Sequence, residues 1–211
     1  MIKDLNRLFP NLLIPATSAG VEFGGKGVSA SLAGRLLVAS SKLQDIYFAR
    51  TVIYVCVHNI TGAMGIIINN PISNLNISDI MEQVGIEEKF HRDVQIHSGG
   101  PLEGNRGFIL HSDDFIAAGS IYQGDGITVT CNAEVLKEIA NGKGPSKSLL
   151  ALGYAGWGIG QLESEIESGA WMIVPADKDI IFGDNNEKKW QTAINSLGFD
   201  IGNLSTVAGH A

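Results

Sequence analysis

Short apolar segments rich in β-branched residues recur along the chain, separated by polar or glycine-containing turns. The strongest is Thr51–His58, TVIYVCVH, in which both alternating faces are mostly apolar. Such a strand is covered on both sides, so we expect it at the centre of a sheet, with Met64–Asn69 as its hairpin partner. The other segments predicted to be extended are Arg35–Ser40, Val94–His97, Gly107–His111, Ser120–Tyr122, Ile127–Cys131, Ser148–Tyr154, Ala170–Val174 and Lys178–Phe182.

Fewer segments have helical spacing. Glu187–Leu197 carries Trp190, Ala193 and Ile194 on one stripe, which is typical of a helix that faces a core. The other predicted helices are Met1–Phe9, Asp79–Val84 after the N-cap Ser78, Ala133–Asn141 after the N-cap Asn132, and about Gly160–Ser168. Because strands outnumber helices without a regular βαβ alternation, the pattern predicts an α+β fold with mixed or antiparallel sheets and helices packed outside.

The beginning of the chain differs from the rest. Ala16–Ser31, ATSAGVEFGGKGVSAS, has the glycine and serine content of a flexible linker. From Leu32 the apolar segments follow one another without a further linker, and a chain of 211 residues suffices for one large domain. We therefore predict a flexible N-terminal extension over residues 1–31 and a single domain over residues 32–211.

Charge limits the choice of partners. The chain has 15 Lys and Arg against 22 Asp and Glu, a net charge of −7, and its basic residues are scattered. Direct binding of nucleic acid is disfavoured, because phosphate contacts need a basic patch. No apolar run reaches the ~20 residues that span a bilayer, so we expect no membrane segment and a cytoplasmic location. Cys56 and Cys131 are expected to be reduced and buried.

The segment Leu152–Glu165, LGYAGWGIGQLESE, combines four glycines with two aromatic residues. Glycine lets backbone approach backbone or ligand, so we predict a tight turn between a strand and a helix. The segment lacks the lysine of a phosphate loop and does not follow the spacing G-x-G-x-x-G. Two interpretations stay open. The glycines could seat Tyr154 and Trp157 against the sheet, or the helix after Gly160 could offer N–H groups to an anion.

Three predicted strands end in histidine, at His58, His97 and His111. If these ends gather, three imidazoles could bind zinc, or one could act as a general base. Histidines bonded within the fold are the simpler interpretation, and we predict no metal and no cofactor. Cys56 lies two residues before His58 on the same predicted strand face and is the candidate reactive thiol. Such a thiol needs a lowered pKa, for which the sequence supplies no adjacent cation.

Several motifs occur together and in order: LAGRLLVAS from Leu32, RTVIYVCVHN from Arg50, GAMGIIINNP from Gly62, SGGPL from Ser98, RGFILH from Arg106, the segment Leu152–Glu165, PAD from Pro175 and a terminal GHA. As a set they closely resemble the YqgE/AlgH family of bacterial proteins over residues 32–211. The resemblance implies a cytosolic α+β domain with a barrel-like β core, no settled activity and no established catalytic residue. It also brings the label of transcriptional regulator, which does not fit an acidic chain without a helix-turn-helix pattern.

The first functional hypothesis is a non-enzymatic binding or regulatory protein whose partner is a small anionic ligand or another protein. Its site would use polar strand ends and glycine turns of these motifs, namely Arg50, His58, Asn59, Asn69, Gly99, Gly100, Arg106, His111, Tyr154 and Trp157. Arg50 and Arg106 could hold an anion bidentately. The alternative is an enzyme, a hydrolase or thiol-dependent enzyme, that uses Cys56 with His58 or His111. A third hypothesis, regulation by direct DNA binding, is disfavoured by the net charge.

Overall fold

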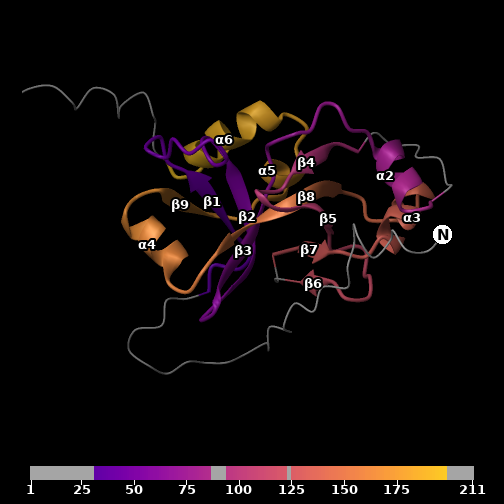
Figure 1. Ribbon diagram of the computed structural model, residues 1–211, viewed down its shortest axis with the longest axis horizontal. Coiled ribbons are helices and arrows are strands. Elements are labelled where there is room, and N and C mark those ends of the chain that lie inside the picture. Colours follow the sequence, from indigo (N-terminus) through magenta and orange to yellow (C-terminus); the bar gives the residue numbers. More distant parts are fainter. Residues whose placement is uncertain (1–30, 87–93, 123–124, 199–211) are drawn as a thin grey trace, which may run out of the picture.

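The computed structural model describes residues 31–86, 94–122 and 125–198, and these contain one sheet of nine strands. The strands are β1 (Arg35–Ala39), β2 (Val52–Asn59), β3 (Gly62–Ile67), β4 (Ile96–Ser98), β5 (Leu102–Ser112), β6 (Ile121–Tyr122), β7 (Ile127–Thr130), β8 (Ser148–Trp157) and β9 (Trp171–Pro175). Their order is β6-β7-β5-β8-β3-β2-β1-β9, with β4 pairing with β8 beside that path (Figure 1). The β4–β8 pair is parallel, and the other strand pairs are antiparallel.

Strand β8 connects the two halves of the sheet. Its residues Ser148–Leu152 pair with β5, and β4 lies alongside the same part of the strand. Its last residues, Ala155–Trp157, pair with β3 of the other half, which continues through β2 and β1 to β9. The two halves therefore share one strand, and the sheet curls into a half-barrel.

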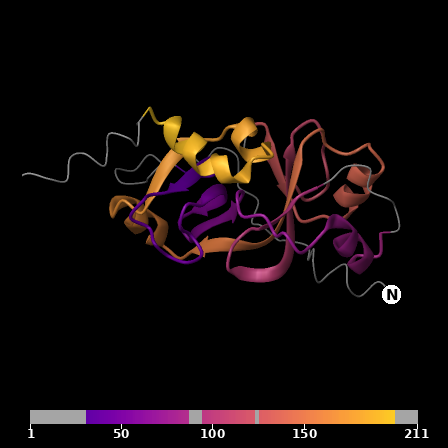
Figure 2. The same cartoon turned by 90° about the horizontal axis from the view of Figure 1, so that it is seen from above.

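Five helices cover this sheet within the described residues: α2 (Ile77–Gln83), α3 (Glu134–Ala140), α4 (Gln161–Glu167), α5 (Lys178–Phe182) and α6 (Asn186–Asn195). Helices α5 and α6 lie over one face, α2 and α3 lie together near β5 and β7, and α4 lies beside β9 at the opposite end (Figures 1 and 2).

Three apolar clusters follow from this arrangement. The first joins Tyr54 of β2 and Phe108 of β5 to Trp190 of α6. The second packs α2 and α3 against β4, β5 and β8, and the third packs α4 against the other face of β1 and β2. Burial of β2 on both faces accounts for its uninterrupted apolar sequence.

The predicted α+β fold is confirmed, with two local corrections. Lys178–Phe182 is a helix and not an extended piece, because the Asp177 side chain accepts the first N–H groups of α5 and caps it. Helix α2 begins after Asn76 and not after Ser78. There Asn76 and Asp79 form a reciprocal capping box, which satisfies two N–H groups at once.

The glycine-aromatic segment is also built differently from the prediction. Strand β8 does not end at Tyr154 but continues to Trp157, and the chain turns at Gly158–Gly160 before α4. Glycines allow close contact between the backbone of β8 and that of the turn before β5. Gly100 has φ 153° and Gly153 has φ 77°, and a side chain on Gly100 would overlap the backbone of Tyr154.

Some predictions lie outside the described residues. These are the helix over residues 1–9, nearly all of the extension over residues 1–31, and the terminal GHA motif. Among the residues that are described, no helix has the length and apolar character needed to cross a membrane.

Candidate functional site

A bulge in β2 separates His58 from Cys56. The pairing register of β2 with β3 shifts between Val55 and Val57. The extra residue reverses the alternation of side chains, so Cys56 packs in the core that α6 covers while His58 points towards α4. The prediction that Cys56 and His58 share one strand face is therefore wrong.

Both ring nitrogens of His58 are hydrogen-bonded inside the protein. The backbone N–H of Leu32 donates to Nδ1 at 2.9 Å, so the ring proton resides on Nε2, which donates to Glu163 Oε1 at 2.8 Å. Hydrogen bonds from its own backbone N–H and from His58 lower the pKa of Glu163. His58 thus anchors α4 to the end of β2.

The Cys56 thiol lies in the apolar core. Burial raises its pKa well above the usual range, and the nearby Cys131 acts in the same direction. Burial also raises the pKa of Cys131 to about 11. A nucleophilic cysteine needs the opposite shift, which a cation or a helix N-terminus supplies. The surroundings of Cys56 are therefore those of a packing side chain.

His97 and His111 lie on opposite faces of the sheet. His97 is the register partner of Ala151, which belongs to the core under α6. The His111 ring meets Phe115 edge-on, on the side of α2 and α3, and its Nδ1–H donates to the carbonyl of the next residue at 2.8 Å. Burial lowers the pKa of His111. The three histidines do not converge, and the described residues contain no group of three His, Cys, Asp or Glu side chains arranged to hold a metal.

One carboxylate holds the end of the glycine-aromatic segment. Glu165 Oε2 accepts the indole N–H of Trp157 at 2.9 Å and that of Trp171 at 2.8 Å, and Gln161 donates to Oε1 at 2.9 Å. The two indole rings also meet edge-to-face, with centroids 6.0 Å apart. These contacts favour the interpretation that this segment serves packing.

The Gly99-Gly100 turn packs against the same strand. The N–H of Gly99 donates to a carbonyl of β8, and Gly100 lies against Tyr154. The Tyr154 hydroxyl donates to Glu103 Oε1 at 3.1 Å, and Arg106 Nη1 donates to Glu103 Oε2 at 3.0 Å. Four predicted site residues thus come together here, but the guanidinium among them is already paired with a carboxylate.

The remaining predicted site residues have local contacts. Asn69 accepts an N–H from the start of β2 and donates to the carbonyl of Arg50, which ties β3 to β2. The Arg50 guanidinium lies 4.8 Å from the centroid of the Trp190 ring. Asn59 Oδ1 accepts the N–H and hydroxyl of Thr61 in the β2–β3 turn. The predicted site residues are therefore distributed over several separate environments.

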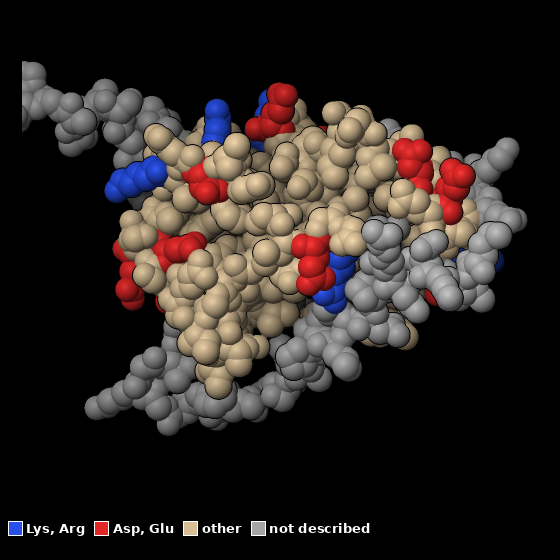
Figure 3. Space-filling model, in the orientation of Figure 1, with Lys and Arg blue, Asp and Glu red and all other residues tan. Residues whose placement is uncertain are grey.

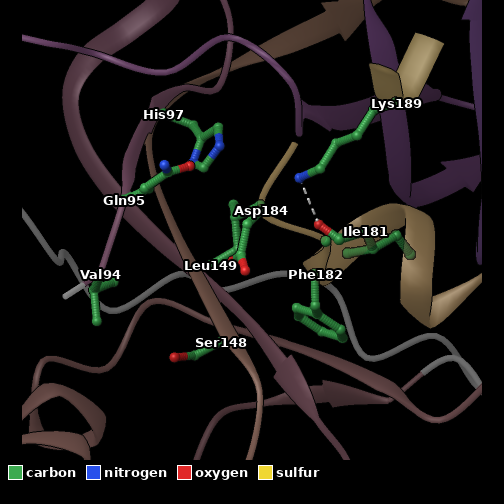
Figure 4. A pocket seen from close by; sticks show the side chains of 10 residues that line it. Val94, Gln95, His97, Ser148, Leu149, Ile181, Phe182, Asp184 and Lys189 are labelled. Atoms are coloured by element: carbon green, nitrogen blue, oxygen red, sulfur yellow. Dashed lines mark hydrogen bonds between the residues drawn. The ribbon is translucent and has the colours of Figure 1, made fainter. Parts of the chain in front are cut away.

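A cavity of about 330 Å³ opens between the sheet and the α5–α6 segment (Figure 4). Strands β4 and β8 supply one wall, and the chain from the end of α5 into α6 supplies the other. The lining residues that matter chemically are Gln95, His97, Leu149, Phe182, Asp184 and Lys189. Apolar and charged side chains thus face the same space.

Lys189 is a buried cation in this cavity. Its side chain is almost wholly enclosed, and Nζ donates at 2.9 Å to the carbonyl of Ile68 and at 2.9 Å to that of Ile181. An ammonium has three N–H donors, so one is left over. Burial lowers the pKa of Lys189 to about 8, although the charge of Asp184 opposes that shift. Among the described residues, no carboxylate lies within ion-pair distance of Nζ.

A chain of hydrogen bonds fixes the tautomer of His97. Nε2 lies 3.0 Å from Asn186 Oδ1, an acceptor, so Nε2 carries the proton; Asn186 Nδ2 donates in turn to Gln95 Oε1 at 2.6 Å. Nδ1 is buried and has no well-aligned hydrogen bond in the described part of the chain, although the backbone carbonyls of Gln95 and Leu150 are near enough to the ring to act on its pKa. Burial lowers the pKa of His97, and the charge of Lys189 adds to that effect, so the ring is neutral near pH 7.

Sequence patterns place His97 at a strand end but give no reason to bring α6 near it. One signal was present. Lys189 precedes Ala193 by four residues and so stands on the buried stripe of α6, where a lysine is unusual. Asn186 gave no comparable signal, because it lies 89 residues beyond the histidine that it orients.

Comparison with known proteins agrees with this fold. A sequence family described as AlgH-like matches residues 36–202. A UPF0301 protein of Bradyrhizobium diazoefficiens is 44% identical over 189 residues, which cover 85% of this chain and 88% of that protein. A UPF0301 protein of Afipia carboxidovorans is 46% identical over 189 residues, covering 85% and 90%.

Two solved structures are similar as well. The solution structure of the AlgH protein from Pseudomonas aeruginosa matches with a TM-score of 0.70 at 38% identity, covering 89% of this chain and 100% of that one. A crystal structure of a Corynebacterium diphtheriae protein matches with a TM-score of 0.63 at 20% identity, covering 78% and 86%. The second likeness concerns the fold alone.

Proposed function

The chain belongs to the AlgH-like family, and on that premise we propose that it is a non-enzymatic binding protein. It takes a small anionic ligand into the cavity between β4, β8, α5 and α6. The observation that carries the proposal is the ammonium group of Lys189, which is buried at the cavity without a carboxylate partner among the described residues.

The energetic reason is the cost of burying a charge. An ammonium taken out of water loses its hydration, and two neutral carbonyls replace only part of it. The lowered pKa of Lys189 expresses this cost. A carboxylate or phosphate in the cavity would accept the remaining N–H and neutralise the charge. The buried ammonium lacks part of its solvation when the cavity is empty. An anion therefore gains more by binding there than by binding an exposed lysine.

This location differs from the pair of arginines that sequence patterns favour. Arg106 is already paired with Glu103, and Arg50 lies over Trp190 at the surface. Enclosure also matters, because a buried charge is screened less by salt and solvent than an exposed one. We therefore assign the anion to Lys189 instead of Arg50 and Arg106.

A regulatory role would operate through ligand binding and not through direct contact with DNA. The net charge is −7, and on the face shown in Figure 3 the Lys and Arg side chains are scattered among Asp and Glu. The alternative of a thiol-dependent enzyme is not favoured, since burial raises the pKa of Cys56.

The proposal is tested by isothermal titration of the full chain with phosphate, acetate, succinate, 3-phenylpropanoate and the twenty amino acids. We expect at least one of these to bind the wild-type protein and the Lys188→Met variant equally. Lys188 is the exposed neighbour of Lys189 on α6 and serves as the matched control. The Lys189→Met variant should bind at least about tenfold more weakly, a loss of about 1.4 kcal/mol.

The pH dependence of ligand affinity is a second test, which uses the wild-type protein and so does not require a folded variant. Affinity of the wild-type protein should fall as the pH rises above about 8, because Lys189 then loses its proton. Binding by none of these compounds, or unchanged binding by a folded Lys189→Met variant, would refute the proposal.

A further inference from the structure

We infer that the ligand of this cavity carries an ammonium group beside its anionic group and is a free amino acid. The inference rests on the proposed function and specifies its ligand. It starts from two residues that line the same cavity as Lys189 (Figure 4). They are His97, whose Nδ1 has no well-aligned hydrogen bond among the described residues, and Asp184, whose carboxylate is exposed.

The cavity that holds the Lys189 donor is also lined by two residues with acceptor groups, His97 and Asp184. The bond from His97 Nε2–H to Asn186 leaves Nδ1 as a lone pair. Asp184 lies in the exposed turn between α5 and α6, and its charge acts on Lys189, but the two side chains are not within ion-pair distance. A carboxylate and an ammonium that line one cavity without meeting leave both charges available to a ligand.

Ligands with a single charge fit this arrangement poorly. A simple anion on Lys189 would also face the Asp184 carboxylate, and a simple amine on Asp184 would face the Lys189 ammonium. Like charges at close range cost binding energy, so each is selected against. A zwitterion can give its carboxylate to Lys189 and its ammonium to Asp184 and His97, which satisfies every group.

The size and the apolar wall narrow the class further. A volume of about 330 Å³ is at the small end of ligand cavities, which run from about 300 to 1,000 Å³. Leu149 and Phe182 supply an apolar part of the wall beside the charged groups. These features suit an amino acid with an aliphatic or aromatic side chain.

The experiment compares matched compounds by titration calorimetry at pH 7. L-phenylalanine is compared with 3-phenylpropanoate, which lacks the ammonium, and with 2-phenylethylamine, which lacks the carboxylate. L-leucine is compared with 4-methylpentanoate and 3-methylbutylamine in the same way. We expect at least one amino acid to bind at least about tenfold more tightly than either of its analogues.

Variants assign the effect to the cavity. Asp184→Asn should weaken binding of the amino acid and bring its affinity close to that of the matched acid, because the repulsion of simple anions is relieved. Asp179→Asn is the control, since this exposed carboxylate on α5 pairs with Lys147 and does not line the cavity. Asp179→Asn should leave the preference for the amino acid unchanged.

The outcomes separate this inference from the function beneath it. If the acids bind as tightly as the amino acids, the ligand is a simple anion. If Asp184→Asn leaves the preference for the amino acid unchanged, Asp184 does not recognise the ammonium group. Either result overturns the inference and leaves the proposed function standing. If neither amino acids nor simple anions bind, the proposed function fails with it.

Discussion

Two ends of the molecule use similar side chains in opposite ways. At the α4 end, both ring nitrogens of His58 are bonded, and Glu165 accepts three N–H groups. Beside α6, Nδ1 of His97 has no well-aligned partner in the described residues, and the buried ammonium of Lys189 donates only to two neutral carbonyls. Paired polar groups contribute to stability, whereas buried groups left open reduce it.

The comparison separates a part of the molecule whose polar side chains stabilise the fold from a part whose polar groups remain able to bind a ligand. The α4 end contains the conspicuous glycine-aromatic segment, and its contacts hold strands and helix together. The cavity is built from residues with ordinary sequence surroundings, and in it His97 Nδ1 and one N–H of Lys189 have unused hydrogen-bonding capacity. Four measurements can break or sharpen this contrast.

The largest effect is expected at the backbone contact between the Gly99-Gly100 turn and β8. Gly100→Ala should lower the free energy of unfolding by about 4 kcal/mol or more, because its φ is 153° and a Cβ would overlap the backbone of Tyr154. Urea unfolding measures the loss. Gly104→Ala is the control, because a Cβ there meets nothing within 4 Å, and it should change stability by less than about 0.5 kcal/mol. Equal effects of the two substitutions would mean that the close contact is not needed.

The next largest effect concerns the carboxylate that holds α4. Glu165→Ala should cost about 3 kcal/mol, because it leaves the N–H groups of Trp157 and Trp171 without an acceptor in a buried place. Glu165→Gln keeps one acceptor oxygen and should cost less. The exposed Glu167 provides the control, and Glu167→Ala should be nearly neutral. If Glu165→Ala also abolished ligand binding, the division between the two ends would be wrong.

The third effect is a dependence on alkaline pH. The pKa of Lys189 is about 8 in the folded protein against 10.5 ordinarily, so between these values the unfolded chain binds more protons. Stability therefore rises with pH in this window, by about 2 kcal/mol between pH 8 and pH 10 from this group. The same pH series is measured for Lys189→Met and subtracted. The difference contains the contribution of Lys189 and removes that of cysteines and tyrosines, which titrate in the same pH range. A flat difference would show that the ammonium is not buried at a cost.

The smallest effect lies on the acid side. The pKa of His97 is lowered in the folded state, so below its ordinary value of 6.5 the unfolded chain takes up the proton more readily. Stability is therefore lost as the pH falls from 7 to 5.5, because the unfolded chain gains the proton first. His97→Gln should show a shallower loss than the wild-type protein in thermal unfolding. An unchanged slope would mean that His97 titrates as an exposed histidine does.

Much of the fold could be predicted because local patterns and long-range packing agree. The apolar alternation of β2 and the buried stripe of α6 both report a periodic surface that packs on a core. Local patterns failed where a tertiary contact decides the outcome. The bulge in β2 moves His58 to the other face, and pairing with β3 extends β8 beyond Tyr154.

The cavity could not be predicted from spacing. His97, Asp184 and Lys189 come from three segments, and only the sheet and the two short helices bring them into one space. Three histidines at strand ends looked equivalent in the sequence. In the fold their neighbours differ, since a backbone N–H and a glutamate saturate His58 while His97 has an asparagine on one nitrogen only. Such differences depend on partners far away in the chain.

The position of β1 has a consequence for how the protein is made. This strand lies between β2, which follows it closely, and β9, which comes much later in the chain. The indole of Trp190 then donates to the carbonyl of Ala39 at the end of the same strand, at 2.8 Å. Until β9 has been synthesised, one edge of β1 has unpaired backbone N–H and C=O groups, and such an edge is a template for pairing with other chains.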